Sequence, residues 1–137
     1  LGLPTGEVRN QLIYLQDLVP TVYDLVGIKK PNHLEFISQI NALKSSKASS
    51  HRKAIYSAYL QEAQRMVTDG HYKLFFIPAS KDAYLFDLEK DPQETNNLFG
   101  SPQYKRIVKR LCAEYQKLSK ESGDTFNLAA IYPELFQ

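Results

Sequence analysis

The chain has 137 residues, of which 43% are hydrophobic and 23% charged, and its formal net charge is +2. These values are ordinary for one globular domain, and so small a net charge does not by itself indicate a polyanionic partner. No apolar run approaches the ~18 residues that span a bilayer, and the one cysteine, Cys112, excludes an internal disulfide framework.

The opening residues predict that the chain is an excised piece of a longer protein. Residues 1–6 carry no initiating methionine, no basic region and no long apolar run. They therefore resemble neither a signal peptide nor an ordinary start. Any export signal of the parent would lie upstream, and the sequence leaves the compartment undecided.

The first predicted helix covers residues 18–27. Asp17 precedes it and can cap it by accepting hydrogen bonds from N–H groups two or three residues on, and Gly27 is a suitable stop. Its apolar residues recur at helical spacing: Leu18, Val22, Leu25 and Val26. A helix this short needs a partner surface. Residues 34–43 predict one or two further helical turns before a polar loop at 44–50.

From residue 54 onward the pattern favours strands. Aromatic and β-branched residues gather in four runs: 54–60, 65–68, 71–77 and 83–88. Asp69-Gly70 lies between the second and third runs and is the preferred filling of a two-residue type I′ turn. That turn predicts a hairpin in which Val67 faces Tyr72 and Met66 faces Lys73.

The longest predicted helix runs from Ser101-Pro102 to about Glu121, with Gly123 as its stop. The tail, residues 124–137, is too apolar to be free and is expected to dock. The predicted fold class is α+β, a small antiparallel sheet of three to four strands packed by a long C-terminal helix and preceded by a short helix. The predicted divisions are a segment at 1–28, a connecting loop at 29–53, a sheet-and-helix subdomain at 54–123 and the apolar tail.

Four acids within eight residues invite a metal-site interpretation: Asp87, Glu89, Asp91 and Glu94. A calcium loop, however, places its oxygen ligands around a glycine-bearing turn, and this loop holds Pro92 and no glycine. Asp91 as N-cap, Pro92 at the first helical position and Glu94 at the third form a capping box. We therefore predict a strand end and a single capped helical turn without a metal.

His51 and Arg52 are the candidate substrate-rim residues. They end the polar loop and begin a strand, and a guanidinium group there would suit a sulfate or an acidic sugar. The simpler interpretation, a solvated strand start, is favoured. His33 and His71 lack companions at metal-ligand spacing and predict no metal site.

The long helix carries a basic face: Lys105, Arg106, Lys109, Arg110, Lys117 and Lys120. This face could indicate nucleic-acid binding, but the near-balanced total charge and the lack of a groove-binding motif favour a solvated face. Cys112 has no base nearby in sequence, so we expect a partly buried, unreactive thiol. Neither a phosphate loop nor a G-x-S-x-G elbow occurs, so no catalytic residue is predicted in this chain.

Three segments together resemble the carboxy-terminal part of the sulfatases. Residues 65–74 follow the family's R-x-V-x-x-G-x-Y-K-L hairpin, and residues 84–99 follow L-F/Y-D-L-x-x-D-P-x-E-x-x-N-L. Residues 17–28 are similar to the D-L-x-P-T-x-x-D-L-x-G-I stretch that closes the family's catalytic α/β domain. Residues 35–43 depart from it, because they lack the glycine and proline of the family's G-x-S-L-x-P-like segment.

The resemblance implies a sulfate ester hydrolase as the parent protein. Sulfatases use a formylglycine, made within a C/S-x-P-S-R motif, together with a divalent cation that is usually calcium. This chain has no such motif, so the resemblance implies that both cofactors belong upstream and that the fragment is inactive alone. Its implied partners are its own N-terminal catalytic domain, on which it packs as one wall of the substrate pocket, and a sulfated small molecule or glycan. A nucleic acid or a membrane is not implied, and the parent is expected in the periplasm or outside the cell.

A rival hypothesis is an independent small α+β module that binds a partner through its sheet face or tail. The first helix discriminates between the two. If the catalytic domain is missing, the apolar side chains of this helix should lie exposed, whereas an independent module should enclose them.

Overall fold

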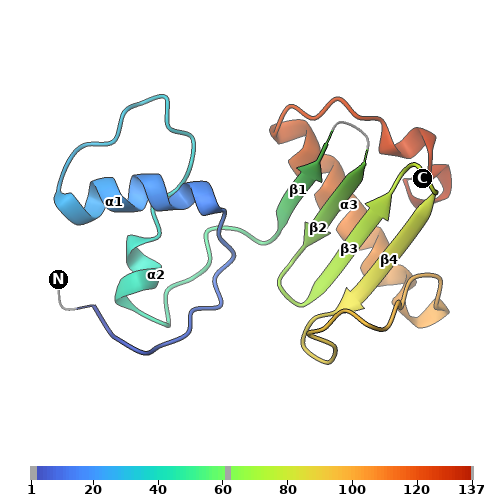
Figure 1. Cartoon of the computed structure of the whole chain (residues 1–137), viewed down its shortest axis with the longest axis horizontal. Coiled ribbons are helices and arrows are strands. Elements are labelled where there is room, and N and C mark those ends of the chain that lie inside the picture. Colours follow the sequence, from blue (N-terminus) through green and yellow to red (C-terminus); the bar gives the residue numbers. More distant parts are fainter. Residues whose placement is uncertain (1–2, 61–62, 137) are drawn as a thin grey trace. The chain divides into compact units, whose positions relative to one another are not determined.

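The computed structural model describes residues 3–60 and 63–136. By its internal contacts the chain divides into two compact units, residues 1–53 and residues 54–137 (Figure 1). Residues 1, 2 and 137 of the predicted opening segment and tail lie outside the described ranges. Within those ranges, none of the helices has the length and apolarity that a membrane crossing requires.

The first unit consists mostly of loops around two short helices. A 3-10 turn, Leu15–Asp17, leads directly into α1, Leu18–Val26, and α2 spans Ile40–Lys44. Gly27 ends α1 in the left-handed region at φ 70°, a conformation that costs glycine little. The helix predicted at 18–27 is therefore present, whereas of the stretch predicted at 34–43 only residues 40–43 are helical, as part of α2.

Asp17 does not cap α1 as predicted. Its carboxylate makes no capping hydrogen bond to that helix. It accepts instead from the backbone N–H of Tyr14 at 2.9 Å, and from the N–H of Ile37 at 3.1 Å, twenty residues along the chain. The side chain turns to these partners because they surround it on the buried side, where none of its surface is exposed.

The second unit is an antiparallel sheet crossed by one long helix, which confirms the α+β prediction. The strands are β1, Ile55–Tyr59; β2, Gln64–Thr68; β3, Tyr72–Ile77; and β4, Asp82–Asp87. They are hydrogen-bonded in the order β1-β2-β3-β4. A 3-10 turn, Pro102–Tyr104, precedes α3, Lys105–Glu121, which lies behind the sheet in Figure 1.

The core of this unit lies between α3 and one face of the sheet. Alternating strand residues point inward and are fully buried, as two-residue periodicity requires: Val67, Leu74, Phe76 and Leu85. The matching stripe on α3 recurs every three or four residues: Val108, Leu111, Cys112, Tyr115 and Ser119. Edge-on contacts of the Tyr115 ring with Tyr56 and Phe76, at centroid distances of 5.5 and 6.0 Å, complete this layer.

The predicted pairing across the second hairpin is wrong by two residues. Val67 lies opposite Leu74 rather than Tyr72, and Met66 lies opposite Phe75. Because side chains alternate along a strand, a shift of two leaves each one on its predicted face. The register was therefore predicted wrongly, but the error does not move any side chain to the other face of the sheet.

The local cause of this shift is the side chain of Asp69. Its Oδ1 accepts from the backbone N–H groups of His71 and Tyr72 at 3.0 and 2.7 Å, which places Gly70 and His71 at the tip of the hairpin. Gly70 takes φ 90°, while neither Asp69 nor His71 has positive φ. A type I′ turn, which needs positive φ at both central residues, is therefore not formed.

The apolar tail docks onto the core of the second unit, as predicted. Two short 3-10 turns, Leu128–Ala130 and Pro133–Leu135, bring Leu128 and Tyr132 into the core. The Tyr132 hydroxyl donates to the backbone carbonyl of Asp82 at 2.8 Å, at the start of β4. The tail thus covers the end of the sheet that the β3–β4 connection leaves open.

A paired carboxylate fastens the segment after α3 to the sheet. Asp124 accepts from Arg65 Nε on β2 at 2.7 Å and from the hydroxyl of Tyr56 on β1. Burial acts to raise the pKa of Asp124, but these hydrogen bonds to its charged form outweigh burial and lower the pKa to about 2. The ionised form is therefore the one that the fold stabilises.

We expect Asp124→Asn to lower the free energy of unfolding by about 2 kcal/mol at pH 7, since the group's pKa falls by nearly two units on folding. A group whose pKa is lower in the folded state than in the unfolded state adds its full share to the free energy of unfolding above its unfolded pKa. This share is lost as the pH falls through its folded pKa. The difference in free energy of unfolding between wild type and variant should therefore shrink as the pH falls from about 5 towards 2. Urea unfolding at several pH values measures it, and a gap that does not change with pH would contradict the assignment.

Candidate functional site

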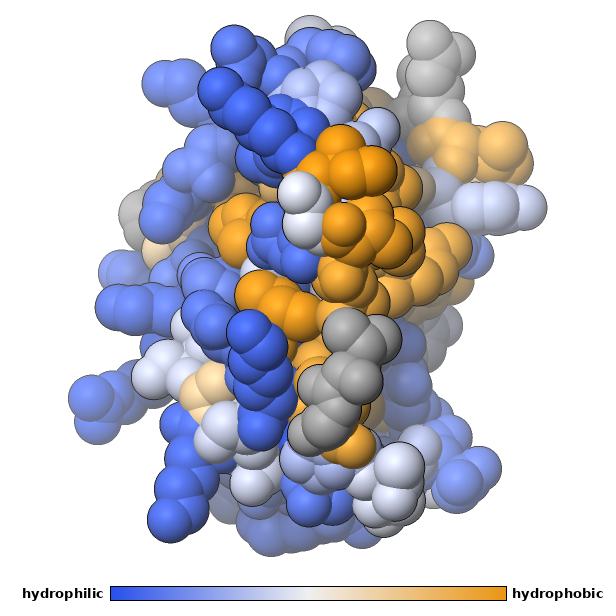
Figure 2. Space-filling view, turned by 90° about the vertical axis from the view of Figure 1, so that its left-hand side faces the viewer, coloured by the Kyte–Doolittle hydropathy of each residue, from blue (hydrophilic) through white to orange (hydrophobic). Residues whose placement is uncertain are grey.

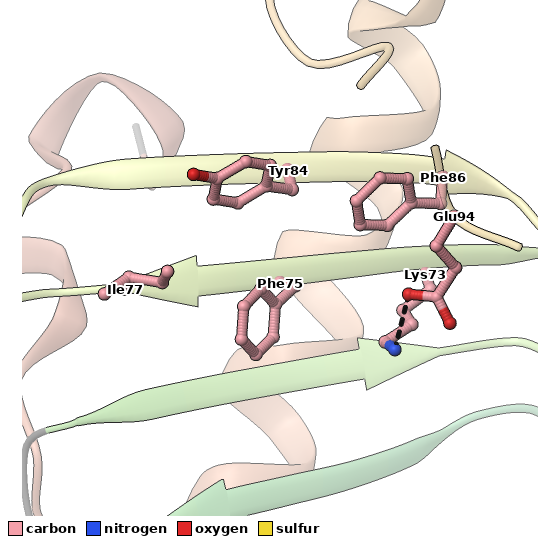
Figure 3. Close-up of a pocket in the computed structure, with 6 residues that line it drawn as sticks. All are labelled: Lys73, Phe75, Ile77, Tyr84, Phe86 and Glu94. Carbon is pink, nitrogen blue, oxygen red and sulfur yellow. Dashed lines mark hydrogen bonds and ion pairs between the residues drawn. The ribbon is translucent and has the colours of Figure 1, made fainter. Parts of the chain in front are cut away.

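A shallow depression lies on the face of the sheet opposite α3. Its volume is about 270 Å³, and six residues line it: Lys73, Phe75, Ile77, Tyr84, Phe86 and Glu94. Figure 3 shows the rings of Phe75, Tyr84 and Phe86 side by side on β3 and β4, with Glu94 reaching in from the loop after β4. The Tyr84 and Phe86 rings are nearly parallel, with centroids 6.1 Å apart.

The charges in this depression neutralise each other. Lys73 Nζ lies 2.7 Å from Glu94 Oε2, with both side chains about one-third exposed or less. The lining therefore offers aromatic surface and one closed ion pair. It holds no nucleophile beside a general base, the minimum that hydrolytic chemistry by side chains needs. The depression is thus suited to packing or binding rather than to catalysis.

The predicted helical turn after β4 is not formed. Residues 91–98 make a series of turns without helix, and Glu94 takes the left-handed φ of 54°. Asp91 does organise the loop, because its carboxylate accepts from the Asn96 N–H at 2.8 Å and from the Thr95 hydroxyl at 3.1 Å. Glu94 cannot complete a capping box, since its side chain pairs with Lys73 instead.

Asn97 holds this loop against the edge of β4. Its Oδ1 accepts from the backbone N–H of Leu85 at 3.0 Å, and its Nδ2 donates to the carbonyl of Ala83 at 3.2 Å. The Leu98 N–H then donates to the Leu85 carbonyl at 2.8 Å. An edge strand otherwise presents unpaired backbone groups, so this asparagine closes the sheet on its outer side.

The other acids of the run also have structural partners. Asp87 is buried, and its Oδ1 lies 3.2 Å from Nε2 of His71 and accepts from the Lys90 N–H at 3.1 Å. In the parts of the chain that the structure describes, no three His, Cys, Asp or Glu residues are placed to hold a metal ion. The described residues thus offer no such cluster for the calcium ion that the sulfatase resemblance implies.

The two predicted rim residues have different surroundings. His51 is exposed, whereas the Arg52 side chain is only 13% exposed. The Arg52 guanidinium donates two hydrogen bonds, of 2.5 and 2.7 Å, to the Asp17 carboxylate. It also lies over the Tyr14 ring, 4.8 Å from the ring centroid. A substrate role for either residue stays a prediction.

Arg52 compensates the most deeply buried acid of the first unit. Burial acts to raise the pKa of Asp17, but the hydrogen bonds from Arg52, Tyr14 and Ile37 lower it below its ordinary value. The carboxylate is held ionised and fully paired, which is the condition under which a buried charge is tolerated. Asp17 and Arg52 are 35 residues apart, so no local pattern pointed to this pair.

Cys112 lies inside the core rather than at its margin. Burial raises the pKa of its thiol to about 12, so almost no reactive thiolate exists at neutral pH. This side chain is a packing residue.

The outward side of α1 is apolar. Leu18, Val22 and Val26 are 50–60% exposed, and only Leu25 of the predicted stripe is half-buried. The exposed apolar set also includes Val19 on α1, and Val8, Ile13, Leu15 and Ile28 in the segments before and after the helix. Figure 2 shows the hydrophobic side chains gathered on this side of the molecule. Exposed apolar patches of this kind are typical of surfaces that bind a protein, a membrane or a ligand.

The family of this chain follows from comparison with known proteins. The family model described as N-sulphoglucosamine sulphohydrolase, C-terminal, matches residues 2–121, most of the chain. The chain belongs to the sulfatase family, as a carboxy-terminal domain. The motifs of residues 65–74 and 84–99 are thus structural signatures of this sulfatase domain, made by the hairpin and by the loop that Asn97 holds.

Named relatives agree with this assignment. The sulfatase domain is 28% identical over 105 residues to an arylsulfatase of Clostridium perfringens, covering 75% of this chain and 22% of that protein. It is 31% identical over 114 residues to a Delta 4,5-hexuronate-2-O-sulfatase of Bacteroides thetaiotaomicron, covering 77% and 24%. The chain thus spans about a quarter of the length of these sulfatases.

A solved structure supports the fold. A protein determined in complex with its substrate D-glucosamine-2-N,6-O-disulfate superposes with a TM-score of 0.68 at 24% identity. The match covers 80% of this chain and 24% of that one. At this identity the likeness establishes the shared α+β architecture.

We predict that Arg52→Ala destabilises the first unit by about 3 kcal/mol, because it leaves the Asp17 carboxylate buried without its counter-charge. His51→Ala is the matched control: its side chain is exposed, so we expect a change within about 0.5 kcal/mol. Hydrogen exchange of residues 3–53 measures both variants. Equal effects of the two substitutions would show that the ion pair does not hold this unit together.

Asn97→Ala should lower the free energy of unfolding of the second unit by about 1–3 kcal/mol, since it leaves backbone groups of β4 unpaired. The neighbouring Asn96 is exposed and its side chain has no hydrogen-bond partner among the described residues, so Asn96→Ala serves as the control. Thermal unfolding followed by circular dichroism compares them. If Asn96→Ala proves as costly as Asn97→Ala, the edge-closing role is wrong.

Proposed function

We propose that this sulfatase domain is the C-terminal part of a sulfate ester hydrolase, packs on an upstream catalytic domain and walls its substrate pocket. The observation that carries the proposal is the apolar patch of α1. Leu18, Val22 and Val26 of α1 are each exposed by half or more. The buried residues of this helix are instead Pro20 and Thr21. In the parent, the patch would be covered by the catalytic domain.

The rival hypothesis of an independent module accounts less well for this distribution of surface. An independent module gains stability by enclosing its apolar helix face, as the second unit does with the core stripe of α3. The first unit leaves its most apolar helix uncovered. Exposure of this kind is costly in water, roughly 25 cal/mol for each Å² of apolar surface, unless a partner covers it.

The chemistry of the parent would lie upstream of this chain. We infer that calcium and the formylglycine belong to the catalytic domain, since residues 3–60 and 63–136 offer no metal-ligand cluster. The substrate would be a sulfated small molecule or glycan, which matches the activities for which the relatives are named. His51 and Arg52 remain proposed rim residues, with His51 the one whose side chain is free to reach a ligand.

Hydrolysis of 4-nitrophenyl sulfate by this chain and by the full-length parent tests the proposal. The chain alone should show no activity above buffer, and the parent should be active in the presence of calcium. The parent reading frame should contain a C/S-x-P-S-R motif upstream. Activity of the chain alone, or a parent without the motif, would overturn the assignment.

Val22→Asp tests the docking surface itself. In the chain alone we expect a change within about 0.5 kcal/mol, because the side chain is already 55% exposed. In the parent the same substitution should cost about 2 kcal/mol or more, since it buries a charge in an apolar contact. Lys29→Asp, on an exposed residue just after α1, is the control. Equal effects of Val22→Asp in the two proteins would exclude docking through α1.

A further inference from the structure

The outer face of α3 is a strip of positive charge. Six basic and two acidic side chains on this 17-residue helix leave it at +4, whereas the whole chain carries +2. The basic residues are all exposed: Lys105, Arg106, Lys109, Arg110, Lys117 and Lys120. The acids of α3, Glu114 and Glu121, stand at the margin of the strip by helical spacing.

The fold keeps these cations in two rows. Lys105 and Lys109 lie one turn apart, as do Arg106 and Arg110, so each pair projects from the same side of the helix at about 5–6 Å spacing. The opposite side of α3 is occupied by the core stripe, which pins the helix against the sheet. The strip is therefore rigid, and from Lys105 to Lys120 it extends over ~23 Å at 1.5 Å per residue.

Most of these charges are available to a ligand. Arg110 is paired with Asp69 at 2.6 Å. In the described part of the chain, the other five make no ion pair or hydrogen bond through their side chains. A row of uncompensated cations raises the local concentration of anions and favours long polyanions over single charges.

The partner that fits this strip is a linear sulfated polysaccharide, and we propose that the outer face of α3 binds one. Its sulfate groups recur along a chain and would meet successive lysines and arginines. A membrane fits less well, because an amphipathic helix that binds lipid inserts its apolar side, and the apolar side of α3 is already buried in the core. The choice of a sulfated sugar over other polyanions rests on the proposed function, and binding can be measured without hydrolysis.

The test measures binding of the full 137-residue chain to heparin by titration calorimetry at several salt concentrations. The variant is Lys105→Gln with Lys109→Gln and Lys120→Gln. Its matched control is Lys29→Gln with Lys44→Gln and Lys47→Gln, three exposed lysines of the first unit. Both change the net charge equally, and circular dichroism checks that both fold.

We expect the α3 variant to bind heparin at least about tenfold more weakly than wild type. The slope of log K against the logarithm of salt concentration should become less negative by up to ~1 for each lysine removed. The control should bind within about twofold of wild type, and desulfated heparin should not bind. Equal weakening in both variants would mean that only net charge matters. Binding of desulfated heparin, or tighter binding of single-stranded DNA of matched charge, would also overturn the proposal, the latter in favour of a nucleic-acid surface.

Discussion

A buried carboxylate held by a distant arginine closes each unit of this sulfatase domain. Asp17 and Arg52 join the start of α1 to the end of the first unit, and Asp124 and Arg65 join the segment after α3 to the sheet. Because a carboxylate buried without its partner is so unfavourable, each pair also excludes alternative arrangements of the loops around it.

The elements of the fold could be predicted from the sequence, whereas the contacts between distant residues could not. Period-two and period-3.6 patterns located the four strands and α3, because those patterns depend only on which side chains face the core. The turn at Gly70 was mispredicted because the Asp69 side chain accepts from the N–H groups of His71 and Tyr72, which moves the tip of the hairpin by one residue. The loop at Glu94 was mispredicted because Glu94 has a partner that local spacing does not reveal. Glu94 pairs with Lys73, 21 residues earlier, and gives up its capping role.

The same limit applies to the candidate site. Residues 84–99 were recognised as the signature of a family, and the structure explains why such a signature is structural. Asp91 organises the loop, Glu94 pairs with β3, and Asn97 closes the edge of β4. Arg52 was noticed as a cation that could meet an oxyanion, and it does hold one, the carboxylate of Asp17. The sequence cannot tell whether a cation serves the protein's own acid or a ligand's.

The strand order β1-β2-β3-β4 affects how the domain is made. Every strand pairs with its neighbour in sequence, so the sheet forms through short loops and few long-range searches, the kind of topology that folds quickly. The exposed α1 face is a different case. In the proposed parent it would stay open to aggregation until the catalytic domain covers it, so it is a surface for chaperones to protect while the second unit folds.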